Sequence, residues 1–113
     1  MVDLKTQSCE ACRIGAPTLS DSEIVKLIDE IDAWTLIEEP VKQLKKIFNF
    51  SSYAEGVNFI NAVAKMSDSE DHHPHIVLEW GKVTVTWWSH KIEGLHQNDF
   101  ICASKTDNLY TAV

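Results

Sequence analysis

Residues 76–90 read IVLEWGKVTVTWWSH, and this stretch decides the fold. Two runs rich in β-branched and aromatic residues, 76–80 and 83–90, flank Gly81 and Lys82, a pair suited to a tight turn. The second run alternates: one face carries Val83, Val85 and Trp87, and the other carries Thr84, Thr86, Trp88 and His90. The pattern predicts an antiparallel hairpin in a sheet with one core face, whose opposite face is solvated or covered by another subunit.

A second hairpin and a helix are predicted upstream of this stretch. Segments 34–38 and 41–50 look extended and are separated by Glu39 and Pro40, which indicates an antiparallel pair. Before them, Ser20 and Glu23 have the spacing of a capping box that opens a helix. The apolar residues of that helix have the spacing of one helical face and are Ile24, Leu27, Ile28 and Ile31.

Two further helices complete the pattern. Ser52 and Glu55 have the spacing of a second capping box, and the helix that they open is predicted to end near Ser67. Its predicted apolar face consists of Tyr53, Val57, Ile60, Val63 and Ala64. The last helix is predicted from about Gln97 to about Leu109, with a weak apolar stripe and with Asp99 in its first turn, where a carboxylate suits the helix dipole.

The order of these elements is α-β-β-α-β-β-α, which predicts an α+β fold in a single domain. Such an order packs best as a four-stranded antiparallel sheet with three helices on one face. Residues 1–19 have neither a helical nor a strand period and are predicted to form a flexible N-terminal arm. The compact domain is therefore expected to span residues 20–113.

Composition narrows the class of protein. A chain of 113 residues that is 44% hydrophobic and 24% charged has the size and make-up of one globular domain. The formal charge of −7 repels polyanions, so no nucleic-acid partner is expected. No apolar run approaches the roughly 20 residues of a membrane span, and the start lacks the pattern of a signal peptide, so we expect a cytoplasmic protein with no membrane partner. Three cysteines, an odd number, are expected to be reduced thiols.

The segment between the second helix and the third strand concentrates titratable side chains. Acidic residues from Asp68 to Asp71 precede His72, His73 and Pro74, and one more histidine follows at position 75. Histidine gives and takes protons near neutral pH, and a neighbouring carboxylate can orient or tune it. Pro74 keeps His73 out of the α region, so the two imidazoles leave a stiff backbone in different directions.

Simpler interpretations of these residues stay open at this point. A His-His-Pro loop is commonly a solvated turn. Metal binding is a second option, although adjacent histidines rarely share one metal and no spaced pair completes a tetrahedral site. Cys9 and Cys12 form a lone C-x-x-C in the arm, which by itself is weak support for metal or redox chemistry.

Taken together, the spacing of five separated elements resembles the signature of the pterin-4a-carbinolamine dehydratase family. These elements are Asp68, the His72-His73-Pro74 run, the aromatic Trp80, His90 and Asp99. The resemblance extends upstream to Trp34 and to the helix 53–66, so it covers about residues 20–110. The tract 79–90 looks like the bacterial branch, whose members act beside phenylalanine hydroxylase.

The resemblance implies a fold, a reaction and a site. The implied fold is the same α-β-β-α-β-β-α order. The implied reaction is dehydration of 4a-hydroxytetrahydropterin to the quinonoid dihydropterin, which recycles the pterin cofactor of an aromatic amino acid hydroxylase without a metal or any other cofactor. The implied catalytic residues are His72, His73 and His90. The implied substrate-binding or orienting residues are Asp68, Asp99 and Trp34.

Other functions and partners also follow from the resemblance. Animal relatives serve as dimerisation partners of a transcription factor, so a protein-binding regulatory module is the main alternative, and a metal-binding protein is the third. The implied partners are the pterin substrate and further copies of the chain in a homodimer or homotetramer, and phenylalanine hydroxylase is a candidate partner.

Overall fold

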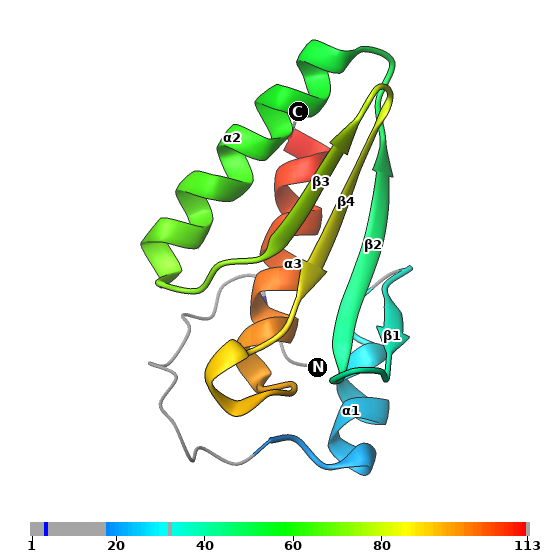
Figure 1. The fold of residues 1–113 in the computed structure, drawn as a ribbon, viewed down its shortest axis with the longest axis vertical. Coiled ribbons are helices and arrows are strands. Elements are labelled where there is room, and N and C mark those ends of the chain that lie inside the picture. The colour runs from blue at the N-terminus through cyan, green and yellow to red at the C-terminus, as the bar shows by residue number, and fades with distance from the viewer. Residues whose placement is uncertain (1–3, 5–17, 32, 113) are drawn as a thin grey trace.

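The computed structural model describes Leu4, residues 18–31 and residues 33–112 (Figure 1). The element order is α1 (Asp21–Ile28), β1 (Thr35–Ile37), β2 (Gln43–Asn49), α2 (Tyr53–Glu70), β3 (His75–Glu79), β4 (Lys82–Trp87), the short 3₁₀ helix η2 (His90–Ile92) and α3 (Gln97–Ala112). This order confirms the predicted α-β-β-α-β-β-α fold. Most of the predicted N-terminal arm, including Cys9 and Cys12, lies outside the described residues, so the arm stays a prediction.

The four strands form one antiparallel sheet in the order β1-β2-β4-β3. Each hairpin pairs its own two strands, and β2 and β4 join the hairpins in the middle, with Leu44 opposite Trp87 and Phe48 opposite Val83. Helices α2 and α3 lie against the same face of the sheet (Figure 1). None of the helices in the described part of the chain is long and apolar enough to cross a membrane.

The inner face of the sheet holds the core, as the alternation in β4 predicts. Val83, Val85 and Trp87 are all fully buried there. The indole N–H of Trp87 donates a 3.1 Å hydrogen bond to Thr106 Oγ1 in α3, so this large aromatic side chain is buried with its polar atom satisfied. The opposite face carries Ile47 and other side chains that remain exposed, because none of the helices in the described part of the chain covers it.

The capping box of α1 is confirmed. Ser20 Oγ accepts a hydrogen bond from the Glu23 amide, and the Glu23 carboxylate accepts one from the Ser20 amide at 2.9 Å. These hydrogen bonds, the backbone one most of all, lower the pKa of Glu23 below its ordinary value. Two donors at the helix start that have no partner within the helix are thereby satisfied.

Helix α2 differs from its prediction in both face and length. Its buried residues are Gly56, Phe59, Val63 and Ser67, whereas Tyr53 and Ala64, which were assigned to the apolar face, are exposed. Phe59 packs on Phe48 of the sheet with ring centroids 4.9 Å apart, and this contact sets the rotation of the helix. The helix also continues past Ser67 to Glu70.

The start of α2 has half of the predicted capping box. Ser52 Oγ accepts from the Glu55 amide, as predicted. The Glu55 carboxylate, however, accepts from the amide of Ser51, at 3.1 Å, and not from that of Ser52. The helix start is therefore capped by two successive serines.

The second hairpin turns one residue earlier than predicted, and its last strand is shorter. Glu79 is paired with Lys82, so Trp80 and Gly81 form the turn, and the positive φ of 78° at Gly81 explains the glycine. Strand β4 ends at Trp87, and His90 begins η2, so the prediction of His90 on the strand is wrong. An isolated bridge between Ser89 and Gly94 closes the loop that carries His90.

Helix α3 begins at Gln97 as predicted and runs to Ala112, three residues beyond the predicted end. Its weak apolar stripe has a structural reason. The helix is buried on several sides between Asn98 and Thr106, and Asn98, Asp99 and Thr106 are buried polar residues, so polar groups with partners replace a simple apolar face.

The end of α2 sets the direction of the loop that carries His72 and His73. Asp71 has a left-handed conformation, with φ of 52° and ψ of 40°, and the His72 amide donates to the Ser67 carbonyl at 3.1 Å. This is the usual way in which a helix ends on a left-handed residue. The reversal places His72 against the core and starts β3 only three residues later.

We expect Asp71→Gly to raise the free energy of unfolding by up to about 1 kcal/mol, because glycine adopts the left-handed conformation without the clash of a Cβ atom. The matched control is Asp29→Gly at the end of α1, where φ is −70° and the backbone is right-handed. That change should lower the free energy of unfolding by about 0.5–1 kcal/mol. Urea denaturation of the three proteins measures both, and the same sign at both positions would contradict the explanation.

Candidate active site

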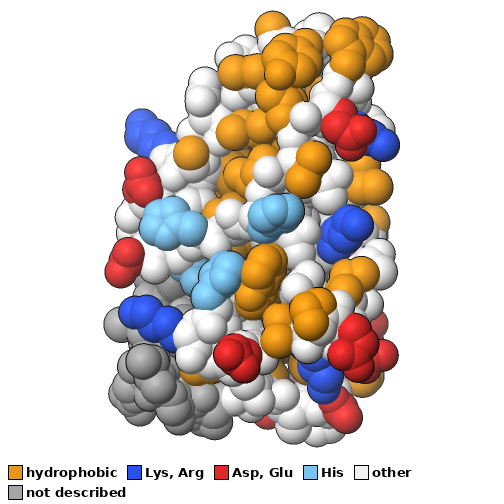
Figure 2. Space-filling model, viewed as in Figure 1, with side chains coloured by type: hydrophobic (Ala, Val, Ile, Leu, Met, Phe, Trp, Pro, Cys, Tyr) orange, Lys and Arg blue, Asp and Glu red, His pale blue; other side chains and the backbone are white. Residues whose placement is uncertain are grey.

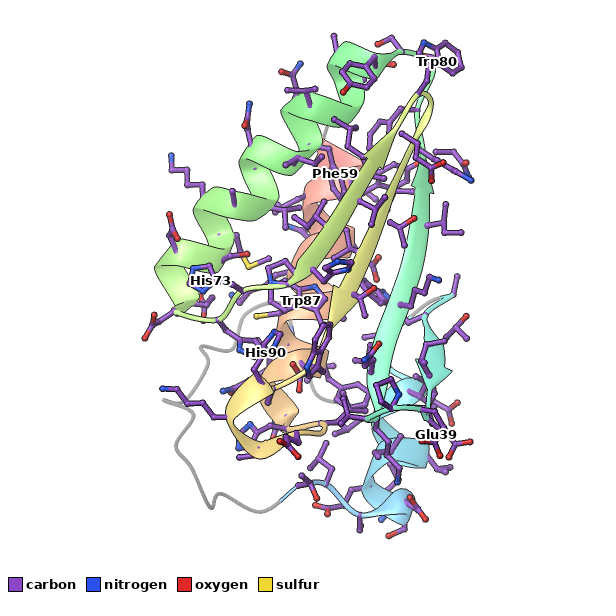
Figure 3. All side chains as sticks on the ribbon, in the orientation of Figure 1. Glu39, Phe59, His73, Trp80, Trp87 and His90 are labelled. Carbon is purple, nitrogen blue, oxygen red and sulfur yellow. The ribbon has the colours of Figure 1, made fainter. Side chains whose placement is uncertain are left out.

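Three segments meet at one end of the sheet, and the first of them is distant in sequence from the other two. They are the loop after α2, the segment that follows β4, and the start of α3 (Figure 3). His73 and His90 lie at this end, on the side of the loop, whereas Trp80 lies at the other end of the same hairpin (Figure 3). The end of α2, the end of β4 and the start of α3 all lie here. Several titratable side chains therefore come together at the edge of the core and do not interrupt it.

His72 and Asp99 form a buried pair. His72 Nε2 lies 2.6 Å from Asp99 Oδ1, and the side chains are 8% and 0% exposed. A carboxylate only accepts hydrogen bonds, so this geometry puts the hydrogen on Nε2 and leaves Nδ1 of a neutral ring as an acceptor. The imidazole also stacks on the Trp87 indole, with centroids 5.3 Å apart and planes 23° apart.

The other oxygen of Asp99 is held by two donors. Ser89 Oγ donates to Asp99 Oδ2 at 2.8 Å, and the His96 amide donates to the same oxygen at 2.9 Å. Asp99 also lies in the first turn of α3, where the helix dipole favours a negative charge. The carboxylate is thus satisfied from three sides, which offsets the cost of burying it.

His73 and Asp68 form a second histidine–aspartate pair, but an exposed one. His73 Nε2 lies 2.9 Å from Asp68 Oδ1, and the side chains are 58% and 81% exposed. The two residues come from the last turn of α2 and from the loop after it. The pair orients the imidazole while leaving it accessible to a bound molecule.

His90 is exposed at the start of η2, where its ring lies 4.2 Å from that of Trp88 at an angle of 44°. His75 approaches the same indole from β3, with centroids 6.4 Å apart. Figure 2 shows histidine side chains gathered on the uncovered face of the sheet, with a hydrophobic side chain among them. The site therefore opens toward this face.

Trp34 lies elsewhere in the fold. Its indole N–H donates to Asp107 Oδ2 in α3 at 2.9 Å, and its ring meets Phe48 edge-on with centroids 6.0 Å apart. It precedes β1, the edge strand farthest from β3. The described contacts join Trp34 to the core and to Asp107, not to the histidines.

Sequence reasoning missed Ser89 and named Trp88 only as a residue on one face of the predicted strand. Ser89 is 1% exposed and holds Asp99, but nothing in its spacing from that residue marks it, because the contact depends on the turn through η2. Among the described residues, no group of three or more histidine, cysteine or acidic side chains has an arrangement that could hold a metal ion.

Chemically, the arrangement combines one fixed imidazole with two accessible ones. His72 is buried and held by a carboxylate and an indole, so it suits binding and orientation. His73 and His90 are exposed imidazoles that can reach a ligand and exchange protons with it. Such a set suits acid–base chemistry on a small, partly polar molecule.

Comparison with known proteins gives a consistent picture. Residues 17–109 match the family model described as pterin 4 alpha carbinolamine dehydratase. The chain is 50% identical over 110 residues to a Nitrosococcus oceani protein named "Putative pterin-4-alpha-carbinolamine dehydratase", with 96% of this chain and 97% of the relative covered. A relative of the same name from Saccharophagus degradans is 49% identical over 111 residues and covers 97% and 98%.

Two solved structures are similar in fold. A transcriptional coactivator/pterin dehydratase from Brucella melitensis superposes with a TM-score of 0.77 at 22% identity, covering 82% of this chain and 98% of that one. A pterin dehydratase-like protein described as a RuBisCO assembly factor in the alpha-carboxysome gives a TM-score of 0.60 at 28% identity, covering 69% and 89%. The similarity to the first, at this identity, shows the shared fold.

The two histidine–aspartate pairs should contribute very differently to stability. We expect His72→Ala to lower the free energy of unfolding by about 3–5 kcal/mol, because it leaves the buried Asp99 carboxylate without its imidazole. His73→Ala, which breaks an exposed pair, should cost less than about 1 kcal/mol. Thermal and urea denaturation measure both losses, and similar losses would contradict the assignment of a buried and an exposed pair.

Proposed function

Because this chain belongs to the pterin 4 alpha carbinolamine dehydratase family, we propose that it converts 4a-hydroxytetrahydropterin to the quinonoid dihydropterin and water, as part of recycling the pterin cofactor of an aromatic amino acid hydroxylase. The observation that supports this most is that His73 and His90 lie at the same end of the sheet (Figure 3), with His72 next to His73 in the loop after α2. The accessible imidazoles of His73 and His90 can supply the proton transfers that a dehydration needs.

The reaction breaks the bond between C4a and the hydroxyl oxygen. One proton must reach the departing hydroxyl, which leaves as water, and one must leave the adjacent ring nitrogen, whose electron pair forms the new double bond. The number of protons on the protein is unchanged over the cycle. An acid and a base of similar strength on the two sides of the substrate are therefore sufficient, and imidazoles meet this need near neutral pH.

We assign the acid and base roles to His73 and His90, because both side chains are exposed. Asp68 orients His73 through the 2.9 Å hydrogen bond. We assign binding and orientation to His72, since Asp99 and the Trp87 ring hold it in one position. In this role its Nδ1 accepts a hydrogen bond from the substrate. The substrate-binding or orienting role expected for Trp34 stays a prediction.

The dehydration rate is the direct test. 4a-Hydroxytetrahydropterin is generated in situ by a phenylalanine hydroxylase, and its loss is followed with and without the protein. We expect wild type to accelerate the loss, and His73→Gln and His90→Gln each to reduce the enzymatic rate by about 100-fold or more, since glutamine can bind but cannot exchange protons.

His96→Asn is the matched control. His96 Nδ1 accepts from the Asn98 amide at the start of α3, and an asparagine oxygen can replace that acceptor. The control should keep the wild-type rate. No acceleration by folded wild type would reject the dehydratase proposal and favour the alternative of a protein-binding regulatory module, to be tested by a pull-down with phenylalanine hydroxylase.

We also propose that the chain self-associates as a homodimer or homotetramer. Strand β3 lies at one edge of the sheet, and an edge strand presents unpaired backbone groups that another copy can pair with. Light scattering after gel filtration should give two or four times the chain mass of 12.8 kDa. A mass of one chain at micromolar concentration would contradict the proposal.

A further inference from the structure

Trp88 is an aromatic side chain at the candidate site and has no role in the proposed proton transfers. It directly follows β4, is only partly buried, and packs with one side on the edge of the core. Two exposed imidazoles lie near its ring, that of His90 with centroids 4.2 Å apart and that of His75 with centroids 6.4 Å apart. These two neighbours come from η2 and from β3, so two elements place imidazoles beside one indole.

The contrast with its neighbour Trp87 is informative. Trp87 is 0% exposed, its N–H is bonded to Thr106, and its ring supports the buried His72. Trp87 is therefore fully occupied by contacts with the core and with the buried histidine–aspartate pair. Trp88 points to the other face, where none of the described helices covers the sheet, and keeps part of its ring accessible next to His90.

We propose that Trp88 is the surface on which the flat pterin ring of the substrate stacks, next to the imidazoles of His90 and His75. The inference rests on the proposed dehydratase function and extends it to a substrate-positioning residue. Indole rings stack well on flat heterocycles, and the contact excludes water from one face of the ligand. A ring lying on Trp88 is within reach of His90, which already contacts the indole.

A stacking surface has a distinct kinetic signature. It contacts the ring in the ground state and in the transition state alike, so its loss weakens binding but leaves the proton transfers intact. Trp88→Leu should therefore raise KM by about tenfold, since stacking of one base on an aromatic side chain contributes on that order, and should change kcat by less than about threefold. Trp88→Phe, which keeps a flat ring, should stay close to wild type.

The experiment measures the affinity for a stable 7,8-dihydropterin by calorimetry, together with KM and kcat in the dehydration assay. Trp80→Leu is the matched control, because Trp80 is 73% exposed at the far end of the same hairpin (Figure 3). We expect Trp88→Leu to weaken dihydropterin binding by about tenfold and Trp80→Leu to leave it unchanged.

The outcomes separate this inference from the proposed function. Wild type that binds dihydropterin and dehydrates the substrate, with Trp88→Leu equal to it in affinity and KM, would overturn the stacking role alone. Wild type that neither binds nor dehydrates would overturn both. Nuclear Overhauser contacts between the Trp88 indole and dihydropterin in the wild-type protein test the same contact without a variant, and their absence in the bound state counts against it.

Discussion

The buried carboxylate of Asp99 is the constraint on which the site depends. A carboxylate that is 0% exposed is costly unless every oxygen is satisfied, and here His72, Ser89 and the His96 amide supply the hydrogen bonds. The donors come from the loop after α2, from the bridge after β4, and from the residue before α3. The hydrogen bonds to the Asp99 carboxylate therefore fix the relative positions of three segments. The positions of the remaining histidines follow from the segments that carry them.

The sheet provides the second constraint, because one of its faces packs on the core and the other carries accessible side chains of the candidate site. Adjacent tryptophans at the end of β4 point to opposite faces. Trp87 supports His72 from inside, and Trp88 meets His90 outside. Because successive residues of a β-strand face opposite sides of the sheet, one of these neighbouring tryptophans lies in the core and the other lies at the candidate site. A change in register here would move both aromatic side chains at once, which is why the strand must pair in register up to this point.

The sequence predicted those parts of the fold that depend on local pattern. The alternation in β4 and the serine cap of α1 are local signals, and both are confirmed. The predicted face of α2 was wrong because Phe59 packs on Phe48, a residue that spacing within the helix cannot reveal, whereas Tyr53 at the helix start is 50% exposed. His90 was placed on the strand because only the bridge from Ser89 to Gly94 shows where the strand ends.

The same distinction explains which site contacts could be foreseen. His73 and Asp68 are five residues apart, close enough for a helix end to bring them together, but the predicted helix ended near Ser67, before Asp68, so the pair was not predicted. The partner of Asp99 was not decided by spacing, since 27 residues separate it from His72. Resemblance to a family supplied both aspartates as site residues, but it did not say that one imidazole is buried and the other exposed. That difference arises from the left-handed turn at Asp71, which directs His72 inward while His73 stays in solvent. Burial suits the first imidazole to the proposed binding role and exposure suits the second to the proposed proton exchange, so one turn of backbone separates the two proposed roles.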